Sequence, residues 1–148
     1  MKRTKTILMA GFVAGTLDAL AAILLFARPV NLHNSSRIFR YIASGLFGKP
    51  AYTTGPLYPL AGLILHYLIA TILSAIYIFI LFRSFKPGYL PAKIFLFASL
   101  IWVIMNGFVM PIAGLTAHYD GWAIMRSWSV LLVCVSLPVC LIAEKRVK

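Results

Sequence analysis

Acidic residues are scarce in this chain: Asp and Glu together number 3 among 148 residues, against 14 Lys and Arg. Asp120 and Glu144 lie near the ends of long apolar stretches, and only Asp18 lies within one. No pair of nearby carboxylates is therefore available for general acid–base chemistry. Glycine-rich phosphate loops and Cys/His metal motifs are missing as well. We expect no cofactor and no bound metal, and the balance is against an enzyme.

Cysteine is scarce too. Cys134 and Cys140 are the only two, and they lie in one apolar stretch. Six residues of helix separate them by about 9 Å along the axis, which is too far for a disulfide between them. They are interpreted as small packing residues.

Apolar residues are abundant instead, at 61% of the chain, with a mean hydropathy of +0.92. Four stretches reach the roughly 17 to 25 residues that cross a bilayer. They are residues 6–27, 58–82, 93–115 and 127–143. Backbone groups in lipid must be satisfied locally, so each stretch is predicted to be a helix. The expected fold is all-α: a single membrane domain, residues 1–148, forming a polytopic four-helix bundle.

The first stretch is predicted to be an uncleaved span. It is longer than the apolar part of a signal peptide, and it ends in Arg28-Pro29 without a small-x-small cleavage site. Pro111 and Pro138 fall inside the third and fourth spans and predict kinks there.

The basic residues predict the topology. Nine Lys and Arg fall on the side of the termini and five on the other, so both termini are predicted to be cytoplasmic. The nine are Lys2, Arg3, Lys5, Arg83, Lys86, Lys93, Lys145, Arg146 and Lys148; the five are Arg28, Arg37, Arg40, Lys49 and Arg126. In so apolar a chain these charges indicate contact with the lipid bilayer, and no nucleic-acid partner is expected.

The long connection between the first two spans contains a helical pattern over about residues 35–47. Ile38 and Ile42 share one face, whereas Arg37 and Arg40 lie on the other. Asn34, Ser35 and Ser36 are its possible N-caps. A short amphipathic helix in the outer membrane interface is the plainer interpretation. The alternative is a lid over a cavity among the spans.

Asp18 is the most informative residue, because a carboxylate at the centre of a span costs roughly 2.5 to 3.5 kcal/mol and should face the protein interior. Small residues share its helix face, and a similar small and polar face recurs in the second span at four-residue spacing. The two sets of helix-packing residues are Gly11, Ala14 and Gly15, and Gly62, Ala70 and Ser74, the second set flanking His66.

One polar residue in each span lies at a similar predicted depth. Asp18, His66, Asn106 and Ser136 are each eight or nine residues from the predicted outer end of their span. This spacing places them about 12 to 14 Å below the outer boundary. The cluster either ties the helices together by hydrogen bonds or, with a proton shared by Asp18 and His66, forms part of a transport path.

Other roles for single residues are weaker. Haem ligation by His66 would need a second histidine at similar depth, whereas His33 and His118 are predicted outside the spans. Arg126 is interpreted as an anchor at the outer mouth, available for pairing with Asp120. An anion site there would need a second converging basic residue, such as Arg37 or Arg40.

Some short motifs resemble a loose class of small four-helix bacterial inner-membrane proteins. They are Gly11-Phe-Val-Ala-Gly15, Gly62-x-x-x-His66 with Tyr77, and Val109-Met-Pro111. The resemblance implies a location in the bacterial cytoplasmic membrane and no particular activity.

Two functions remain open. The first is a non-enzymatic accessory subunit, associating with itself or with another membrane subunit, in which the polar cluster is structural. The second is a proton-linked small transporter or channel that uses Asp18 and His66. An intramembrane enzyme is a weaker third possibility, because no nucleophile or metal set accompanies these two residues.

Overall fold

Helices account for nearly all of the computed structural model, which describes residues 2–52, 55–82, 89–115 and 120–147 and contains no strand within them. Four stretches are long and apolar enough to cross a membrane: Arg3–Phe26, Leu57–Leu81, Leu90–Ile112 and Gly121–Arg146. The prediction of an all-α chain with four apolar helices is confirmed. These helices define the class of the molecule, a multi-pass helical membrane protein.

Three of the four stretches contain a π-helical segment. The first is regular throughout. In chain order the elements are α1 (Lys2–Phe26), α3 (Leu57–Ile76) with η2 (Tyr77–Leu81), α5 (Leu90–Ile104) with η3 (Met105–Val109) and α6 (Met110–Ile112), and α7 (Gly121–Val130) with η4 (Leu131–Ser136) and α8 (Leu137–Arg146).

Proline accounts for two of the π-helical segments. Segment η3 ends two residues before Pro111, and η4 ends two residues before Pro138. Proline has no N–H and its ring clashes with the carbonyl four residues earlier, so the preceding turn widens. The irregularity predicted at these prolines therefore lies in the turn before each one. Segment η2 has no proline, and nothing in the sequence indicated it.

The fourth helix extends beyond the predicted span at both ends. The helix begins at Gly121 because Asp120 caps it: the Asp120 carboxylate accepts a hydrogen bond from the Ala123 N–H at 2.6 Å. It continues to Arg146, three residues beyond the predicted end. This shift changes the depth of every residue counted from the start of that span.

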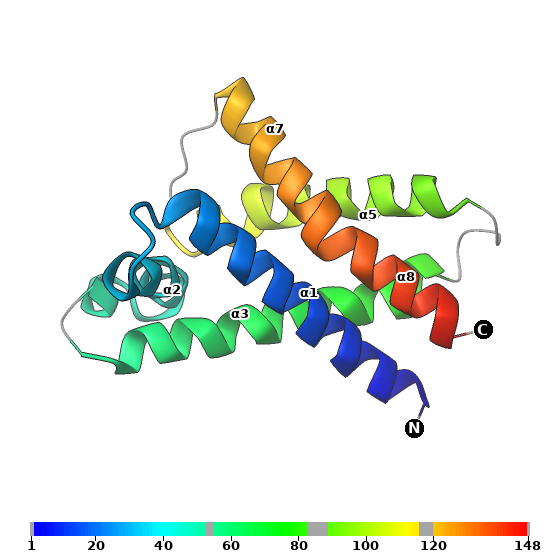
Figure 1. The fold of residues 1–148 in the computed structure, drawn as a ribbon, viewed down its shortest axis with the longest axis horizontal. Coiled ribbons are helices and arrows are strands. Elements are labelled where there is room, and N and C mark those ends of the chain that lie inside the picture. Colours follow the sequence, from blue (N-terminus) through cyan, green and yellow to red (C-terminus); the bar gives the residue numbers. More distant parts are fainter. Residues whose placement is uncertain (1, 53–54, 83–88, 116–119, 148) are drawn as a thin grey trace.

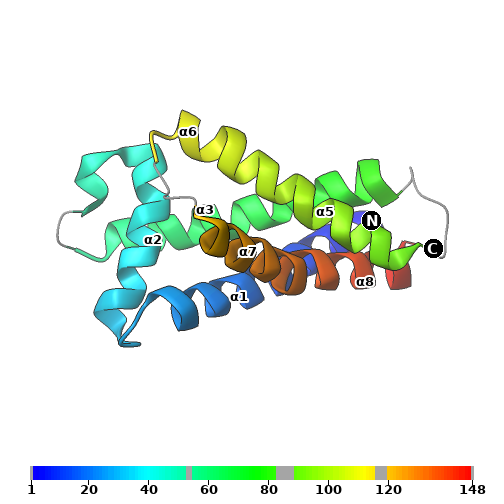
Figure 2. The ribbon, with the colours of Figure 1, turned by 90° about the horizontal axis from the view of Figure 1, so that it is seen from above.

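A fifth helix, α2 (Leu32–Phe47), lies between the first two spans and is followed by the short η1 (Lys49–Tyr52). It begins three residues earlier than predicted, with Asn31 as the N-cap in place of Asn34, Ser35 or Ser36, and the Asn31 side chain accepts from the Asn34 N–H at 2.8 Å. Figures 1 and 2 show α2 running across one end of the molecule, transverse to the long helices. We call this end the α2 end.

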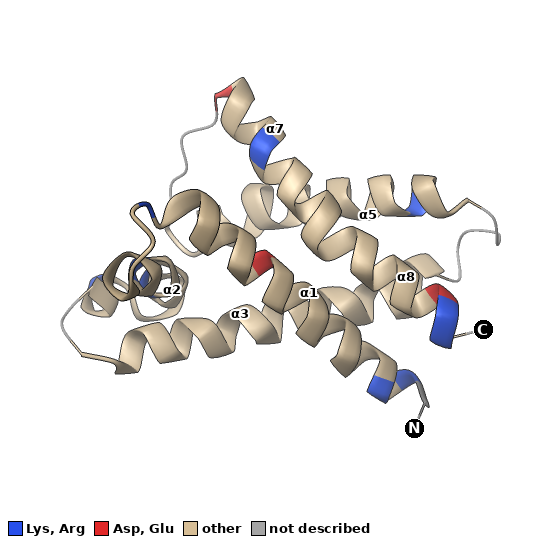
Figure 3. Ribbon diagram, in the orientation of Figure 1, with Lys and Arg blue, Asp and Glu red and all other residues tan. Residues whose placement is uncertain are grey.

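Both termini lie at the opposite end, which we call the terminal end (Figure 1). The ribbon coloured by charge shows basic residues at both ends, around α2 and α7 and near the two termini (Figure 3). Of the basic residues counted for topology, Arg83, Lys86 and Lys148 lie outside the described residues.

Close contact between α1 and α3 depends on glycine. A Cβ on Gly11 would lie 2.7 Å from the Thr71 Cα, and one on Gly15 would lie 2.8 Å from the Tyr67 ring. The backbones therefore approach more closely than larger side chains would allow. On its other side, α1 packs against η4 and α8.

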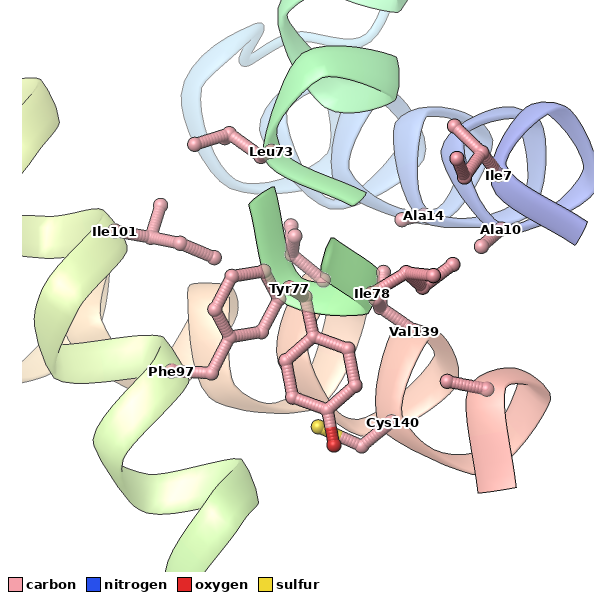
Figure 4. Packing of buried hydrophobic residues seen from close by; sticks show 12 residues of the cluster. Ile7, Ala10, Ala14, Leu73, Tyr77, Ile78, Phe97, Ile101, Val139 and Cys140 are labelled. Atoms are coloured by element: carbon pink, nitrogen blue, oxygen red, sulfur yellow. The ribbon is translucent and has the colours of Figure 1, made fainter. Parts of the chain in front are cut away.

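A buried apolar cluster fills the space where α1, η2, α5 and α8 meet (Figure 4). Its largest members are Tyr77 and Phe97, whose ring centroids are 4.8 Å apart, and both are fully buried. The Tyr77 hydroxyl lies beside the Cys140 sulfur in Figure 4. This cluster is the dry part of the interior, and it lies between the terminal end and the polar residues described next.

Candidate functional site

Asp18 and His66 are brought together by the contact between α1 and α3. The Asp18 Oδ2 lies 4.0 Å from the His66 Nε2, and the two side chains are 25% and 13% exposed. Gly15 lies one turn from Asp18 on α1, and its close approach to Tyr67 places the neighbouring His66 against α1. The structure thus pairs the only acid within the first span with the only histidine in the second.

The proton on this face of His66 can be located. The Nε2 lies 2.8 Å from the Gly15 carbonyl oxygen, and a carbonyl can only accept, so Nε2–H is the donor. The Asp18 carboxylate accepts no hydrogen bond from the described part of the chain. The ion-pair partner of Asp18 is therefore an imidazole that donates its Nε2 proton to Gly15.

Aromatic rings hold the imidazole from two sides. Phe39 of α2 packs edge-on against His66 with 6.3 Å between ring centroids, and Tyr67 does so at 5.8 Å. The Tyr67 hydroxyl is in turn hydrogen-bonded to the Thr16 hydroxyl of α1 at 3.0 Å. These contacts restrict the ring to small reorientations between Gly15 and Asp18.

A cavity of about 100 Å³ opens beside the pair. Every long helix and α2 contribute to its wall, which apart from the pair is apolar. The lining residues are Asp18, Ile42, His66, Ile69, Ala70, Leu73, Ile101, Met105, Leu131 and Val135. A water molecule occupies about 30 Å³ of liquid, so a few waters fit here. We call this cavity the central chamber.

A second space of about 230 Å³ adjoins the chamber beneath α2. The two share Ile42, Ile69 and Met105 as walls, and the second space is lined by apolar residues together with Tyr41 and Gly45. Ile42, Ile69 and Met105 therefore lie between the two spaces, and Ile42 is the one that α2 contributes.

Helix α2 packs against α3 at several points, including the Phe39–His66 and Phe47–Tyr58 ring contacts. At Gly62 the two helices come so close that a Cβ would overlap the Phe39 carbonyl oxygen, so only glycine permits this crossing. Arg40 fastens the following turn, because its guanidinium donates to the carbonyl oxygens of Ala51 at 3.2 Å and Gly55 at 2.6 Å. The predicted helix-packing residues Ala14, Ala70 and Ser74 are also buried. All these contacts are made within the chain.

Ser136 does not belong with the pair. It is fully buried, and its hydroxyl donates to the Ile94 carbonyl oxygen at 2.6 Å. Ser136 is also absent from the residues that line the central chamber, although its neighbour Val135 is among them.

Asn106 lies in η3, and its side-chain amide donates to the Trp102 carbonyl oxygen one turn earlier at 2.9 Å. Met105 beside it lines the chamber, whereas Asn106 does not. The predicted group of four thus contracts to the Asp18–His66 pair.

The three basic residues predicted at the outer mouth have different environments in the structure. Arg40 holds the turn after α2, as described above. Arg126 lies over the Phe26 ring, 4.7 Å from its centroid, and Asp120 serves as the cap of α7, so the expected Arg126–Asp120 pairing is not formed. Arg37 lines a groove of about 660 Å³ at the α2 end.

Two polar contacts were missed from the sequence. Lys93 and Glu144 form an ion pair of 2.6 Å at the terminal end, with side chains 2% and 15% exposed. The signal available was their equal depth, since each begins or ends a span on the same side. The Trp128 indole also donates to the Ser99 hydroxyl at 3.2 Å, which joins α7 to α5.

No three His, Cys, Asp or Glu side chains of the described ranges converge as metal ligands. His118, considered as a second haem ligand, lies outside the described residues. His33 lies on α2 and is exposed, away from His66.

Comparison with protein-family models, with curated proteins and with solved structures gave no match. The function of this chain must therefore be inferred from its own geometry.

Proposed function

We propose that this protein is a proton-linked small transporter or channel, in which Asp18 and His66 exchange protons with water in the central chamber. The observation that carries the proposal is the Asp18 carboxylate. It faces a small, mostly apolar cavity among the helices and accepts no hydrogen bond from the described residues. Ionisable groups so placed are costly, and they commonly mark ion or proton paths.

Transfer between the two residues needs only a small movement. The imidazole Nε2 is 2.8 Å from the Gly15 oxygen and 4.0 Å from the Asp18 Oδ2. A modest ring rotation or one bridging water brings the donor within reach of the carboxylate. Protonated Asp18 would be neutral and inexpensive in the apolar chamber, and His66 would return the proton to the chamber water.

Helix α2 is proposed to act as the gate. Ile42, Ile69 and Met105 line both the chamber and the apolar space beneath α2, and α2 is anchored just before Ile42, by Phe39 against Gly62 and by the Arg40 hydrogen bonds. A rotation of α2 about the Phe39–Gly62 contact would move Ile42 aside. Of the two interpretations of this helix that the sequence allowed, we therefore propose the lid over a cavity and not the plain interfacial helix.

The proposed location is the bacterial cytoplasmic membrane, with both termini in the cytoplasm. The excess of Lys and Arg on the side of the termini supports this orientation. The α2 end and its gate would then face outward.

A non-enzymatic accessory subunit is the second candidate. The hydrogen bond from His66 to the Gly15 backbone favours it, because that bond ties α3 to α1 without any proton transfer. The small-residue faces give it no support, since Thr71, Tyr67 and Phe39 of the same chain already cover Gly11, Gly15 and Gly62.

Proton flux into liposomes distinguishes the two candidates. Protein would be reconstituted with an internal pH-sensitive dye, and a potassium gradient with valinomycin would set the membrane potential. We expect wild-type flux well above that of empty liposomes and at least a tenfold loss in Asp18→Asn, which keeps the shape but cannot ionise.

Asp120→Asn is the matched control, since asparagine also caps a helix N-terminus and the flux should persist. Wild-type liposomes no more permeable than empty ones, or an Asp18→Asn variant that is folded and fully active, would refute the transport proposal. The structural candidate predicts a small change in thermal stability and no flux in either protein.

A further inference from the structure

A broad groove at the α2 end is not used by the proposed proton path. It has a volume of about 660 Å³, within the range of roughly 300 to 1,000 Å³ that ligand pockets occupy. The end of α1, the following connection, α2 and η1 form its walls. The lining residues are Phe26, Arg28, Asn34, Arg37, Ile38, Tyr41 and Tyr52.

The positive charge in this groove is not neutralised. Arg37 has no hydrogen-bond or ion-pair partner among the described residues, and Arg28 uses only its Nε, which donates to the Leu24 carbonyl oxygen at 3.3 Å. Asp120, the acid nearest in sequence to Arg126, is occupied as the cap of α7. The guanidinium groups of Arg28 and Arg37 therefore keep N–H donors that make no hydrogen bond to the described residues.

Arg126 adds a third charge beside the groove. Its guanidinium lies 4.7 Å from the centroid of Phe26, whose side chain also lines the groove. Arg28 and Arg37 thus line the groove, and Arg126 lies against Phe26 in its wall.

We propose that this groove binds a phosphate group, and that its source is the headgroup of an anionic phospholipid. Guanidinium groups bind phosphate through two parallel N–H donors, and an unpaired arginine at a membrane surface has few other anions to meet. Phe26, Ile38 and the two tyrosines would contact the glycerol and the upper acyl chains. A soluble phosphate compound has the same headgroup chemistry without those chains.

The test measures binding to the full chain, purified in a neutral detergent. Dioleoyl phosphatidylglycerol, dioleoyl phosphatidylcholine and sn-glycerol 3-phosphate would be titrated separately, with the rise in Tm and native mass spectrometry as readouts. We expect phosphatidylglycerol to bind and stabilise, and an Arg28→Gln/Arg37→Gln double variant to bind it at least tenfold more weakly.

Two control variants separate this loss from damage to the fold. Arg146→Gln removes an exposed charge at the terminal end and should bind phosphatidylglycerol as wild type does. Arg40→Gln removes the hydrogen bonds to Ala51 and Gly55, so it should lower Tm without lipid but keep the lipid-dependent rise.

Three results would contradict a phospholipid headgroup in this groove. Equal stabilisation by both lipids, or undiminished phosphatidylglycerol binding by the double variant, would overturn it. Tighter binding of glycerol 3-phosphate than of the lipid would overturn the lipid source while keeping the phosphate site. Proton flux plays no part in this test, so its result is independent of the proposed function.

Discussion

Two buried or half-buried acids of this chain differ in how they are satisfied: Glu144 near the terminal end meets a lysine directly, whereas Asp18, nearer the α2 end, accepts no hydrogen bond from the described residues. Lys93 and Glu144 meet at 2.6 Å beside a dry aromatic cluster, and the Lys93 ammonium also lies 5.2 Å from the Phe82 ring centroid. Asp18 faces a cavity 4.0 Å from His66, and Arg37 lines an open groove. A charge satisfied within the chain serves the scaffold, whereas an unsatisfied one is available to water, protons or ligands.

The largest stability effect should come from breaking the pair at the terminal end. Lys93→Met removes the ammonium that lies 2.6 Å from the Glu144 carboxylate in a largely buried place, and we expect a loss of up to about 3 to 5 kcal/mol of unfolding free energy. Equilibrium unfolding of the purified protein in mixed micelles would measure it.

A double variant, Lys93→Met with Glu144→Leu, removes both charges and should recover most of that loss. If the single variant is as stable as wild type, the pair contributes no scaffold stability and the contrast between the two ends fails.

The crossing of α2 over α3 gives the next largest effect. Gly62→Ala places a methyl group where the Phe39 carbonyl lies 1.8 Å away, so α2 must shift, at a cost of about 1 to 3 kcal/mol. Cysteine cross-linking between α2 and α3, or the unfolding measurement above, would detect the shift.

Gly107→Ala is the matched control, because its nearest neighbour is 3.9 Å from the added methyl. It should be neutral or slightly stabilising, since alanine favours helix by up to about 1 kcal/mol. Equal effects of the two substitutions would contradict a specific α2 anchor.

The smallest effect is expected inside the dry cluster. The buried Tyr77 hydroxyl has no hydrogen-bond partner among the described residues, so Tyr77→Phe should be neutral or stabilise by about 1 kcal/mol. The same change at Tyr67 loses the bond to Thr16 and should destabilise by about 0.5 to 1.5 kcal/mol.

Comparing these two variants in one unfolding assay tests whether the terminal end is as dry as its packing indicates. A marked loss of stability in Tyr77→Phe would mean that its hydroxyl has a partner, such as a buried water or the Cys140 sulfur.

The candidate site was only partly predictable. Asp18 could be singled out because an acid in a span is costly wherever it lies, and His66 because it shares a face with small residues. Ser136 was grouped with them by counting from a predicted span end, but its hydroxyl bonds to the Ile94 carbonyl of α5 instead. Lys93 was assigned to the membrane surface, although tertiary packing buries it against Glu144.

The sequence by itself determined that the chain has four membrane-length helices, where its prolines would disturb them, and which acid lies within a span. These follow from local properties: hydropathy, helix rise and the missing proline N–H. Only the tertiary structure decided that α2 crosses the end of the molecule, that Arg37 and Arg28 share a groove, and which charges find partners. Such pairings join residues far apart in the chain, and they depend on close approaches at Gly15 and Gly62 that hydropathy does not encode.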